Sequence, residues 1–244
     1  MTNKTIIIIG ATCSLGREIC FIYAKNGFDL ILISRREDKN EDLKNQIEQS
    51  YPKIEISTYQ LDILDLNKQV QIYKEINKIP DGVISLIGET HHVNEIRDKN
   101  LLRIINTNYS YLVNFLSYFL NDFQKNKKGF LICISSVAGL RGRAKNFIYG
   151  SAKSGLNTFL SGCRNYFNNT EIFIMTVLPG FIKNNNKKKN TIENLLQIEP
   201  SILAKKIYLA HRQKKEILYS SYLWKLIMTI IGILPNKIFN KIKF

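Results

Sequence analysis

A regular alternation of short β-branched runs with longer segments of helical period is the feature that most constrains the fold. The short runs are almost continuously apolar, a pattern typical of strands buried on both faces of a sheet. Because strands and helices alternate along the chain, the connections are expected to be right-handed crossovers. The sequence therefore predicts an α/β fold, a single doubly wound parallel sheet with helices on both faces. The predicted strands are Thr5–Ile9, Leu30–Ser34, Ile54–Tyr59, Gly82–Leu86, Gly129–Ser135, Glu171–Leu178 and Glu216–Tyr219.

Segments of helical period fill the gaps between these strands, and no repeat or Pro/Ser-rich linker interrupts the pattern. Residues 1–220 are therefore expected to form one domain. The polar run Lys183–Asn190 consists of Lys and Asn alone and predicts a mobile loop, because it cannot form a core. The predicted helices are Leu15–Asn26, Asp38–Gln49, Leu66–Ile76, Asn100–Phe123, Tyr149–Phe167 and Ser201–Arg212.

Charge and cysteine content narrow the possible partners and compartments. The chain has 35 Lys and Arg against 20 Asp and Glu, a formal net charge of +15, which favours anionic partners. No nucleic-acid-binding motif is present, so nucleic acid is not an expected partner. The four cysteines form no C-x-x-C pair, and the N-terminus lacks the pattern of a signal peptide, which together indicate a cytoplasmic protein. His91 and His92 lie near Glu89 without a suitably spaced third ligand, so no metal site is expected.

Small residues follow the first predicted strand and open a helix, in the order Gly10-Ala-Thr-Cys-Ser-Leu-Gly16. A strand–turn–helix unit of this kind can place a pyrophosphate at the helix N-terminus. Glycines in such a turn can equally serve only the local packing.

The second and third predicted strands end in residues suited to an adenosine. Ser34 is followed by Arg35 and Arg36, where a site for NAD would place an acid, so the arginines favour the 2′-phosphate of NADP. Asp62 and Ile63 end the third strand, within reach of an adenine amino group. The alternative is that the arginines are a solvated charge pair.

Tyr149 and Lys153 are spaced i, i+4 at the start of a predicted helix, and Ser135 and Ser136 end the strand before it. The spacing places phenol and ammonium on one helix face, where the lysine charge can stabilise a tyrosinate. Tyr149 would then be a usable acid near neutral pH.

These turns and the Ser, Tyr and Lys together resemble the short-chain dehydrogenase/reductase family, whose fold is of the Rossmann type, over nearly the whole chain. The resemblance implies an NADP(H)-dependent oxidoreductase that reduces a carbonyl. It implies catalytic roles for Ser136 and Asn108, with Asn106 as the alternative to Asn108, beside Tyr149 as proton donor and Lys153. The cofactor-binding residues that it implies are Gly10, Thr12, Cys13, Ser14, Leu15, Gly16, Ser34, Arg35, Arg36, Asp62, Ile63, Gly88, Tyr149, Lys153, Pro179, Gly180, Ile182 and Asn184.

The chain departs from the family pattern at several of these positions. Ile9 and Ser14 replace a threonine and a glycine of the first turn, only Gly88 remains of the segment after the fourth strand, and Asn184 replaces a threonine. These changes keep a second interpretation open, a catalytically weak member that binds a nucleotide or has a regulatory role.

The segment from Ser135 to Lys153 looks like a bacterial subgroup that includes decaprenyl-phosphoryl-ribose 2-keto reductase. That likeness implies a keto-sugar or a polyprenyl-phosphate-linked keto-sugar as substrate, with residues 181–198 as the substrate loop. Arg141 and Arg143 would then hold a phosphate, or would simply be solvated loop residues. The family also implies a homodimer or homotetramer formed through the long helices.

Residues 221–244 form an apolar and basic tail. The uncharged run Leu226–Leu234 is far shorter than the roughly 20 residues that a spanning helix needs. Trp224 before it and Lys237, Lys241 and Lys243 after it are typical of a helix lying on an anionic membrane, which would make the protein membrane-peripheral. The alternative is that the tail packs on the sheet or closes an oligomer interface.

Overall fold

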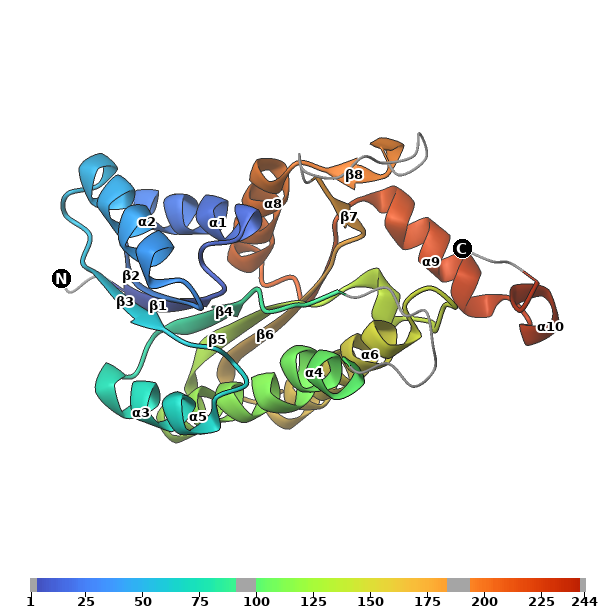
Figure 1. Cartoon of the computed structure of the whole chain (residues 1–244), viewed down its shortest axis with the longest axis horizontal. Coiled ribbons are helices and arrows are strands. Elements are labelled where there is room, and N and C mark those ends of the chain that lie inside the picture. Colours follow the sequence, from blue (N-terminus) through green and yellow to red (C-terminus); the bar gives the residue numbers. More distant parts are fainter. Residues whose placement is uncertain (1–3, 91–99, 184–193, 242–244) are drawn as a thin grey trace.

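Seven of the β-branched runs pair as one parallel sheet in the computed structural model, which describes residues 4–90, 100–183 and 194–241. The strand order is β3-β2-β1-β4-β5-β6-β9, so the direction of winding reverses between β1 and β4 (Figure 1). The predicted fold class is confirmed. The strands are β1 (Lys4–Ile9), β2 (Phe28–Ser34), β3 (Ile56–Gln60), β4 (Gly82–Ser85), β5 (Lys128–Ile134), β6 (Glu171–Leu178) and β9 (Ile217–Tyr219).

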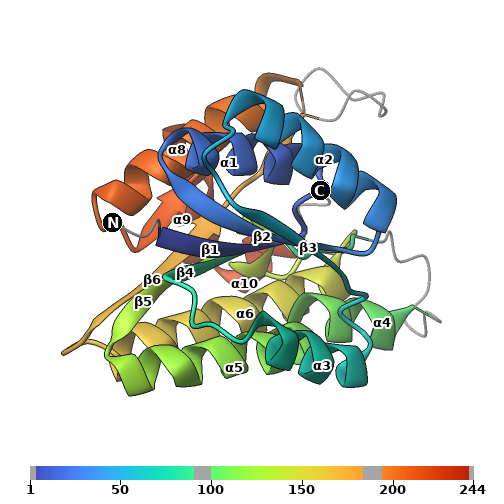
Figure 2. The ribbon, with the colours of Figure 1, turned by 90° about the vertical axis from the view of Figure 1, so that its left-hand side faces the viewer.

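Helices cover both faces of this sheet, as Figure 2 shows. Helices α1 (Ser14–Lys25), α2 (Glu37–Ser50) and α8 (Pro200–Arg212) lie on one face. The other face is covered by α3 (Leu66–Ile76), α4 (Leu101–Ile105), α5 (Tyr111–Asn126) and α6 (Phe147–Tyr166). The strands alternate their side chains between two apolar clusters, so that Ile6 and Ile8 of β1 face the first helix layer while Ile7 and Ile9 face the second.

The predicted helix Asn100–Phe123 is interrupted. Between α4 and α5 the backbone widens into a π-helical turn, Asn106–Ser110, in which the N–H of Tyr111 donates to the carbonyl of Asn106. A continuous apolar pattern conceals this turn, because a π-turn adds one residue without ending the helix.

His211 near the end of α8 is partly buried. Its Nδ1 lies 2.8 Å from the Tyr23 hydroxyl, and its ring packs against Phe130 and Phe173. Burial, together with the charge of Lys214, lowers the pKa of His211 to about 4.

The segment after β6 contains elements that the sequence did not predict. Strands β7 (Phe181–Ile182) and β8 (Gln197–Ile198) pair in parallel at the two ends of the expected substrate loop, most of which, with Asn184, lies outside the described residues. The last helices are α9 (Tyr222–Ile233) and α10 (Asn236–Phe239). Across the described ranges, no helix combines the length and apolar character that crossing a membrane requires.

Candidate active site

The predicted site residues lie along the carboxyl edge of the sheet, on both sides of the paired strands β1 and β4. This is the switch point of a doubly wound sheet, at which the connections leave in opposite directions and at which folds of this type bind their ligands. The turn after β1, the segment after β4 and the start of α6 all meet this edge (Figure 1).

The turn between β1 and α1 is shaped by two glycines. Gly10 has a φ of +88°, which disfavours other residues, and its N–H donates to the Ile33 carbonyl at 2.7 Å. A Cβ on Gly16 would stand 2.6 Å from the carbonyl oxygens of both Gly10 and Ala11, so only glycine allows α1 to approach the turn. Cys13 caps α1, its Sγ accepting from the Gly16 N–H at 3.3 Å. The backbone of the turn therefore lies at the N-terminus of α1. The side chains of Thr12 and Ser14 are at least partly accessible, and that of Leu15 is buried.

The end of β2 exposes two arginines. The Ser34 hydroxyl is buried and bonded to the backbone of Arg36, so it supports the turn. Arg35 and Arg36 are exposed, and within the described ranges neither guanidinium forms an ion pair. Asp62 after β3 is exposed, while the side chain of Ile63 is buried in the core. A ligand could reach Ile63 only through its backbone.

Lys153, Asn108 and Gly88 lie together beneath the segment after β4. Nζ of Lys153, buried at 1% exposure, donates to the Ile87 carbonyl at 2.9 Å and to the Ile134 carbonyl at 3.3 Å. A Cβ on Gly88 would stand 3.4 Å from that Nζ and 3.5 Å from Oδ1 of Asn108. Glycine at this position therefore keeps the approach to both polar groups open.

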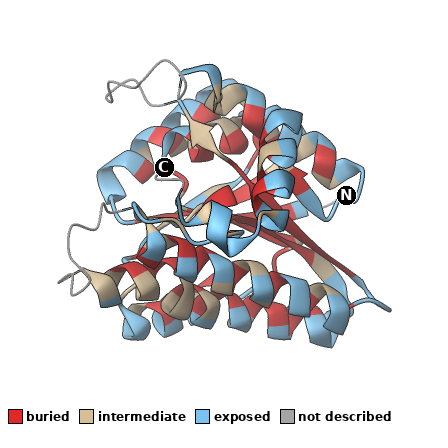
Figure 3. Cartoon of the chain, turned by 90° about the vertical axis from the view of Figure 1, so that its right-hand side faces the viewer, coloured by how far each residue is buried: buried red, intermediate tan, exposed pale blue. Residues whose placement is uncertain are grey.

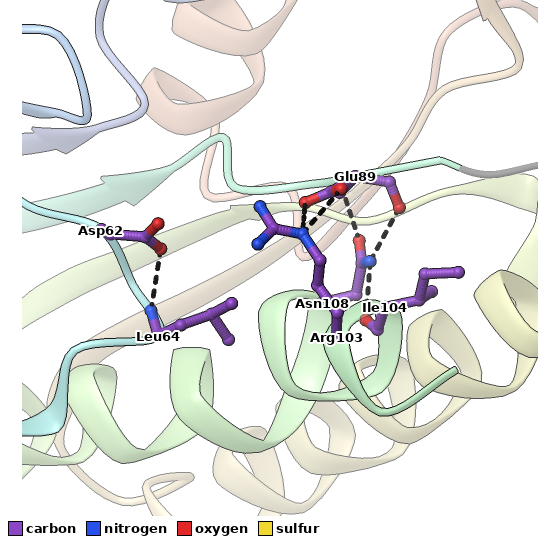
Figure 4. A network of polar contacts seen from close by, with 6 residues as sticks. All are labelled: Asp62, Leu64, Glu89, Arg103, Ile104 and Asn108. Atoms are coloured by element: carbon purple, nitrogen blue, oxygen red, sulfur yellow. Dashed lines mark hydrogen bonds and ion pairs between the residues drawn. The ribbon is translucent and has the colours of Figure 1, made fainter. Parts of the chain in front are cut away.

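Asn108 is fixed by a network that the sequence did not reveal (Figure 4). Its Nδ2 donates to the carbonyls of Glu89 and Ile104, both at 2.9 Å, and its Oδ1 accepts from the Glu89 N–H at 3.2 Å. The Glu89 carboxylate in turn accepts from Nε of Arg103 at 3.0 Å. Glu89 and Arg103 are fourteen residues apart, and no pattern in the chain indicates their pairing. Asn106, the alternative to Asn108, has no part in this network.

Ser136 and Tyr149 meet across the loop between β5 and α6. The Ser136 hydroxyl lies beside the Tyr149 phenol, whereas the Ser135 hydroxyl donates to the Lys153 carbonyl at 3.4 Å. Of the two serines, the structure thus brings Ser136 to the tyrosine. Burial raises the pKa of Tyr149, and the Ser136 hydroxyl and the charge of Arg143 oppose that rise.

Lys153 lies on the same side of α6 as Tyr149. Its Nζ lies 5.9 Å from the centre of the Tyr149 ring, and Arg143 is the cation whose charge lowers the pKa of the phenol. The pKa of Lys153 itself is lowered to about 8, because burial disfavours the ammonium ion. The ammonium also faces carbonyls beside Gly88.

Pro179 and Gly180 follow β6 at the same edge. A Cβ on Gly180 would stand 2.0 Å from the Trp224 ring, so glycine is required for α9 to pack there. Ile182 lies in β7 and is half-buried against the core. The Arg141 guanidinium is held by the C-terminal segment, because it donates to the Leu234 carbonyl at 2.7 Å and to Asn236 Oδ1 at 2.9 Å.

The described residues fit a nicotinamide dinucleotide. Gly10 and Gly16 allow the tight turn from β1 into α1, and Gly88 lies beside Lys153 and Asn108. The N-terminus of α1 suits a pyrophosphate, and exposed arginines stand where the adenosine end would lie. Among the residues that the structure describes, no group of three or more His, Cys, Asp or Glu could hold a metal ion. His91 and His92 lie outside those residues.

Comparison with known proteins agrees with this architecture. The sequence model described as short chain dehydrogenase matches residues 4–194, and the chain belongs to this family. A relative is the NADP-dependent 3-hydroxy acid dehydrogenase of Schizosaccharomyces pombe, 25% identical over 240 residues, 91% of this chain and 92% of that one.

Solved structures share the fold over almost the full length. A 7beta-hydroxysteroid dehydrogenase superposes with a TM-score of 0.86 at 16% identity, covering 98% of this chain and 96% of that one. The protein ElxO with NADP bound superposes with a TM-score of 0.77 at 24% identity, covering 89% of this chain and 97% of that one.

Proposed function

We propose that the protein is an NADPH-dependent reductase of carbonyl compounds. The observation that carries the proposal is the convergence of Ser136, Tyr149, Lys153 and Asn108 on the edge that also carries the glycine turn. Bound NADPH supplies a hydride to the carbonyl carbon. Consumption of NADPH by the purified protein with a ketone, dependent on Tyr149, tests the proposal.

Each side chain has a role that its surroundings support. The Tyr149 hydroxyl donates the proton to the carbonyl oxygen, and its raised pKa keeps it protonated at neutral pH. Ser136 holds that oxygen by a hydrogen bond, and the Lys153 ammonium holds the nicotinamide ribose. Asn108 holds a water that replenishes the proton. Both hydrogens of its Nδ2 are engaged, so it would hold this water through an acceptor oxygen.

Arg35 and Arg36 set the preference for NADPH over NADH. We expect NADPH to bind at least tenfold tighter than NADH, a difference of about 1.4 kcal/mol, because the 2′-phosphate would pair with one or both guanidinium groups. Fluorescence titration measures both affinities. In the double variant Arg35→Ala/Arg36→Ala the preference should disappear, with NADH affinity unchanged. Equal affinities in the wild type, or a preference that survives both substitutions, would contradict the assignment.

The substrate is proposed to carry its carbonyl next to an apolar group. Val137, the residue after Ser136, packs with Leu178, Trp224 and Met228, so the reacting group borders an apolar cluster. A keto-sugar linked to a polyprenyl phosphate belongs to this class. A panel of ketones with and without lipid tails, assayed for NADPH consumption, distinguishes these substrates.

The alternative function is a catalytically weak member of the family that binds nucleotide for regulation. The substitutions Ile9 and Ser14 in the first turn are its support. NADPH binding without turnover across the ketone panel would favour this alternative.

We expect a homodimer or homotetramer formed through α5 and α6. Both helices present side chains to a shared apolar hollow that includes Leu120, Phe159 and the largely exposed Tyr166. Light scattering at micromolar concentration should give two or four times the mass of the 28.2 kDa chain. Phe159→Asp should produce monomers, and Leu209→Asp on the opposite helix layer should not. A monomeric wild type would contradict this assembly.

A further inference from the structure

Helix α9 has two apolar faces, of which only one packs on the protein. Trp224, Met228 and Ile231 are buried at 8% exposure or less and pack against Val137 and Leu178. Trp224 also donates from Nε1 to the Leu196 carbonyl at 2.9 Å. This face therefore anchors α9 to the rim of the candidate active site.

The opposite side of α9 presents a stripe of apolar side chains to solvent. Leu223, Leu226, Ile230 and Ile233 recur at helical spacing and are 43%, 46%, 48% and 78% exposed. Ile238 of the following helix α10 is likewise exposed, at 52%. We call these five side chains the apolar stripe. Figure 1 places α9 and α10 at the end of the molecule opposite the N-terminus, and Figure 3 looks onto that end. A contiguous exposed apolar surface of this kind indicates an interaction site.

The charge around the apolar stripe is of one sign. Lys225, Lys237 and Lys241 are exposed beside it, and from Ile217 to the end the sequence contains no Asp or Glu. A symmetric contact with a second copy would bring these lysines together without an acid of this segment to pair with. An anionic surface would instead neutralise them.

The segment that carries the apolar stripe is also fastened to the active-site loop. Arg141 lies five residues after Ser136, and its guanidinium donates to the carbonyls of Ile231 and Leu234 at the end of α9. It also lies 3.9 Å from the centre of the ring of Phe239, the last residue of α10. These contacts fix the orientation of α9 relative to Ser136 and Tyr149.

We propose that α9 and α10 dock the protein on a bilayer that contains anionic lipid, with the apolar stripe in the headgroup region and the active-site rim facing the membrane. A helix of 12 residues is about 18 Å long, which suits a position in the plane of the surface. As a consequence that rests on the proposed function, a carbonyl substrate carried in the bilayer would enter at this rim.

Vesicle sedimentation tests the docking independently of catalysis. The full-length protein should sediment with vesicles of phosphatidylcholine and phosphatidylglycerol at low salt, and much less with phosphatidylcholine alone or at high salt. Leu226→Gln/Ile230→Gln should weaken binding at least tenfold without changing the net charge. Lys225→Gln/Lys237→Gln should weaken it about tenfold as well. Ile202→Gln/Leu209→Gln, at exposed positions on α8, is the matched control and should bind like the wild type.

Several results would overturn the docking. One is a wild-type protein that does not bind anionic vesicles. Another is a loss of vesicle binding in the α8 control as large as that in Leu226→Gln/Ile230→Gln. If Leu226→Gln/Ile230→Gln changed the oligomeric state in solution without affecting vesicle binding, the apolar stripe would belong to a contact between copies. Circular dichroism and NADPH titration verify that each variant is folded.

Catalysis is measured separately, with one ketone in solution and one embedded in the vesicles. The Leu226→Gln/Ile230→Gln variant should reduce the soluble ketone at the rate of the wild type. Its rate with the embedded ketone should be at least tenfold lower than that of the wild type. Equal rates of both proteins on the embedded ketone would overturn entry from the bilayer. Vesicle binding without reduction of either ketone would instead contradict the proposed reductase while leaving the docking intact.

Discussion

Tyr149→Phe should lower the rate of carbonyl reduction by on the order of 10²-fold or more and leave NADPH binding almost unchanged. The substitution removes only the hydroxyl that Ser136 contacts, and the ring remains to fill its place at the start of α6. Single-turnover NADPH oxidation and fluorescence titration measure the two quantities.

Tyr166→Phe is the matched control, because it makes the same change at the other end of the same helix. Its turnover should equal that of the wild type. If Tyr149→Phe keeps its turnover, Tyr149 is not the proton donor. If the variant loses NADPH binding as well as turnover, Tyr149 has a structural role.

Lys153→Met should lower turnover about as much as Tyr149→Phe does. It should also change how the free energy of unfolding depends on pH. The folded pKa of Lys153 is about 8, while that of an unfolded lysine is about 10.5. Between these values the unfolded chain binds more protons, so this group makes the folded state more stable as the pH rises. The free energy of unfolding of the wild type, relative to Lys153→Met, should increase by about 3 kcal/mol from pH 8 to 10.5.

Urea unfolding of both proteins without cofactor at a series of pH values measures this difference, in which the other titrating groups cancel. Lys205→Met, on the exposed side of α8, is the control and should run parallel to the wild type. A difference between wild type and Lys153→Met that does not vary with pH would mean that the ammonium is not desolvated.

Most of the fold could be predicted because its signals are local. The strand β6 and the helix α3 begin and end where the sequence placed them, since continuous β-branched runs and amphipathic periods identify such elements directly. The small sheet of β7 and β8 could not be predicted, because two-residue strands carry no periodicity and owe their pairing to contacts distant in sequence.

The residues of the candidate site also differ in whether local sequence signals could predict them. Gly10, Gly16, Tyr149 and Lys153 belong to short motifs, so their proximity follows from adjacent turns and helices. Glu89, Arg103 and Trp224 act through partners far along the chain, and Arg141 caps a helix 90 residues away. The role of Arg143 beside Tyr149 likewise depends on the path of a loop, which no spacing rule gives.

The π-helical turn at Asn106–Ser110 lets one helical segment satisfy two demands that a regular helix could not meet together. Before the turn, Ile104 offers its carbonyl to Asn108, and after it Phe115 and Phe119 fill the core against the sheet. Each added residue rotates a helix by about 100°, so the turn shifts the phase between these two faces. Deleting one residue there would restore a uniform period, and either Asn108 or the two phenylalanines would then point the wrong way.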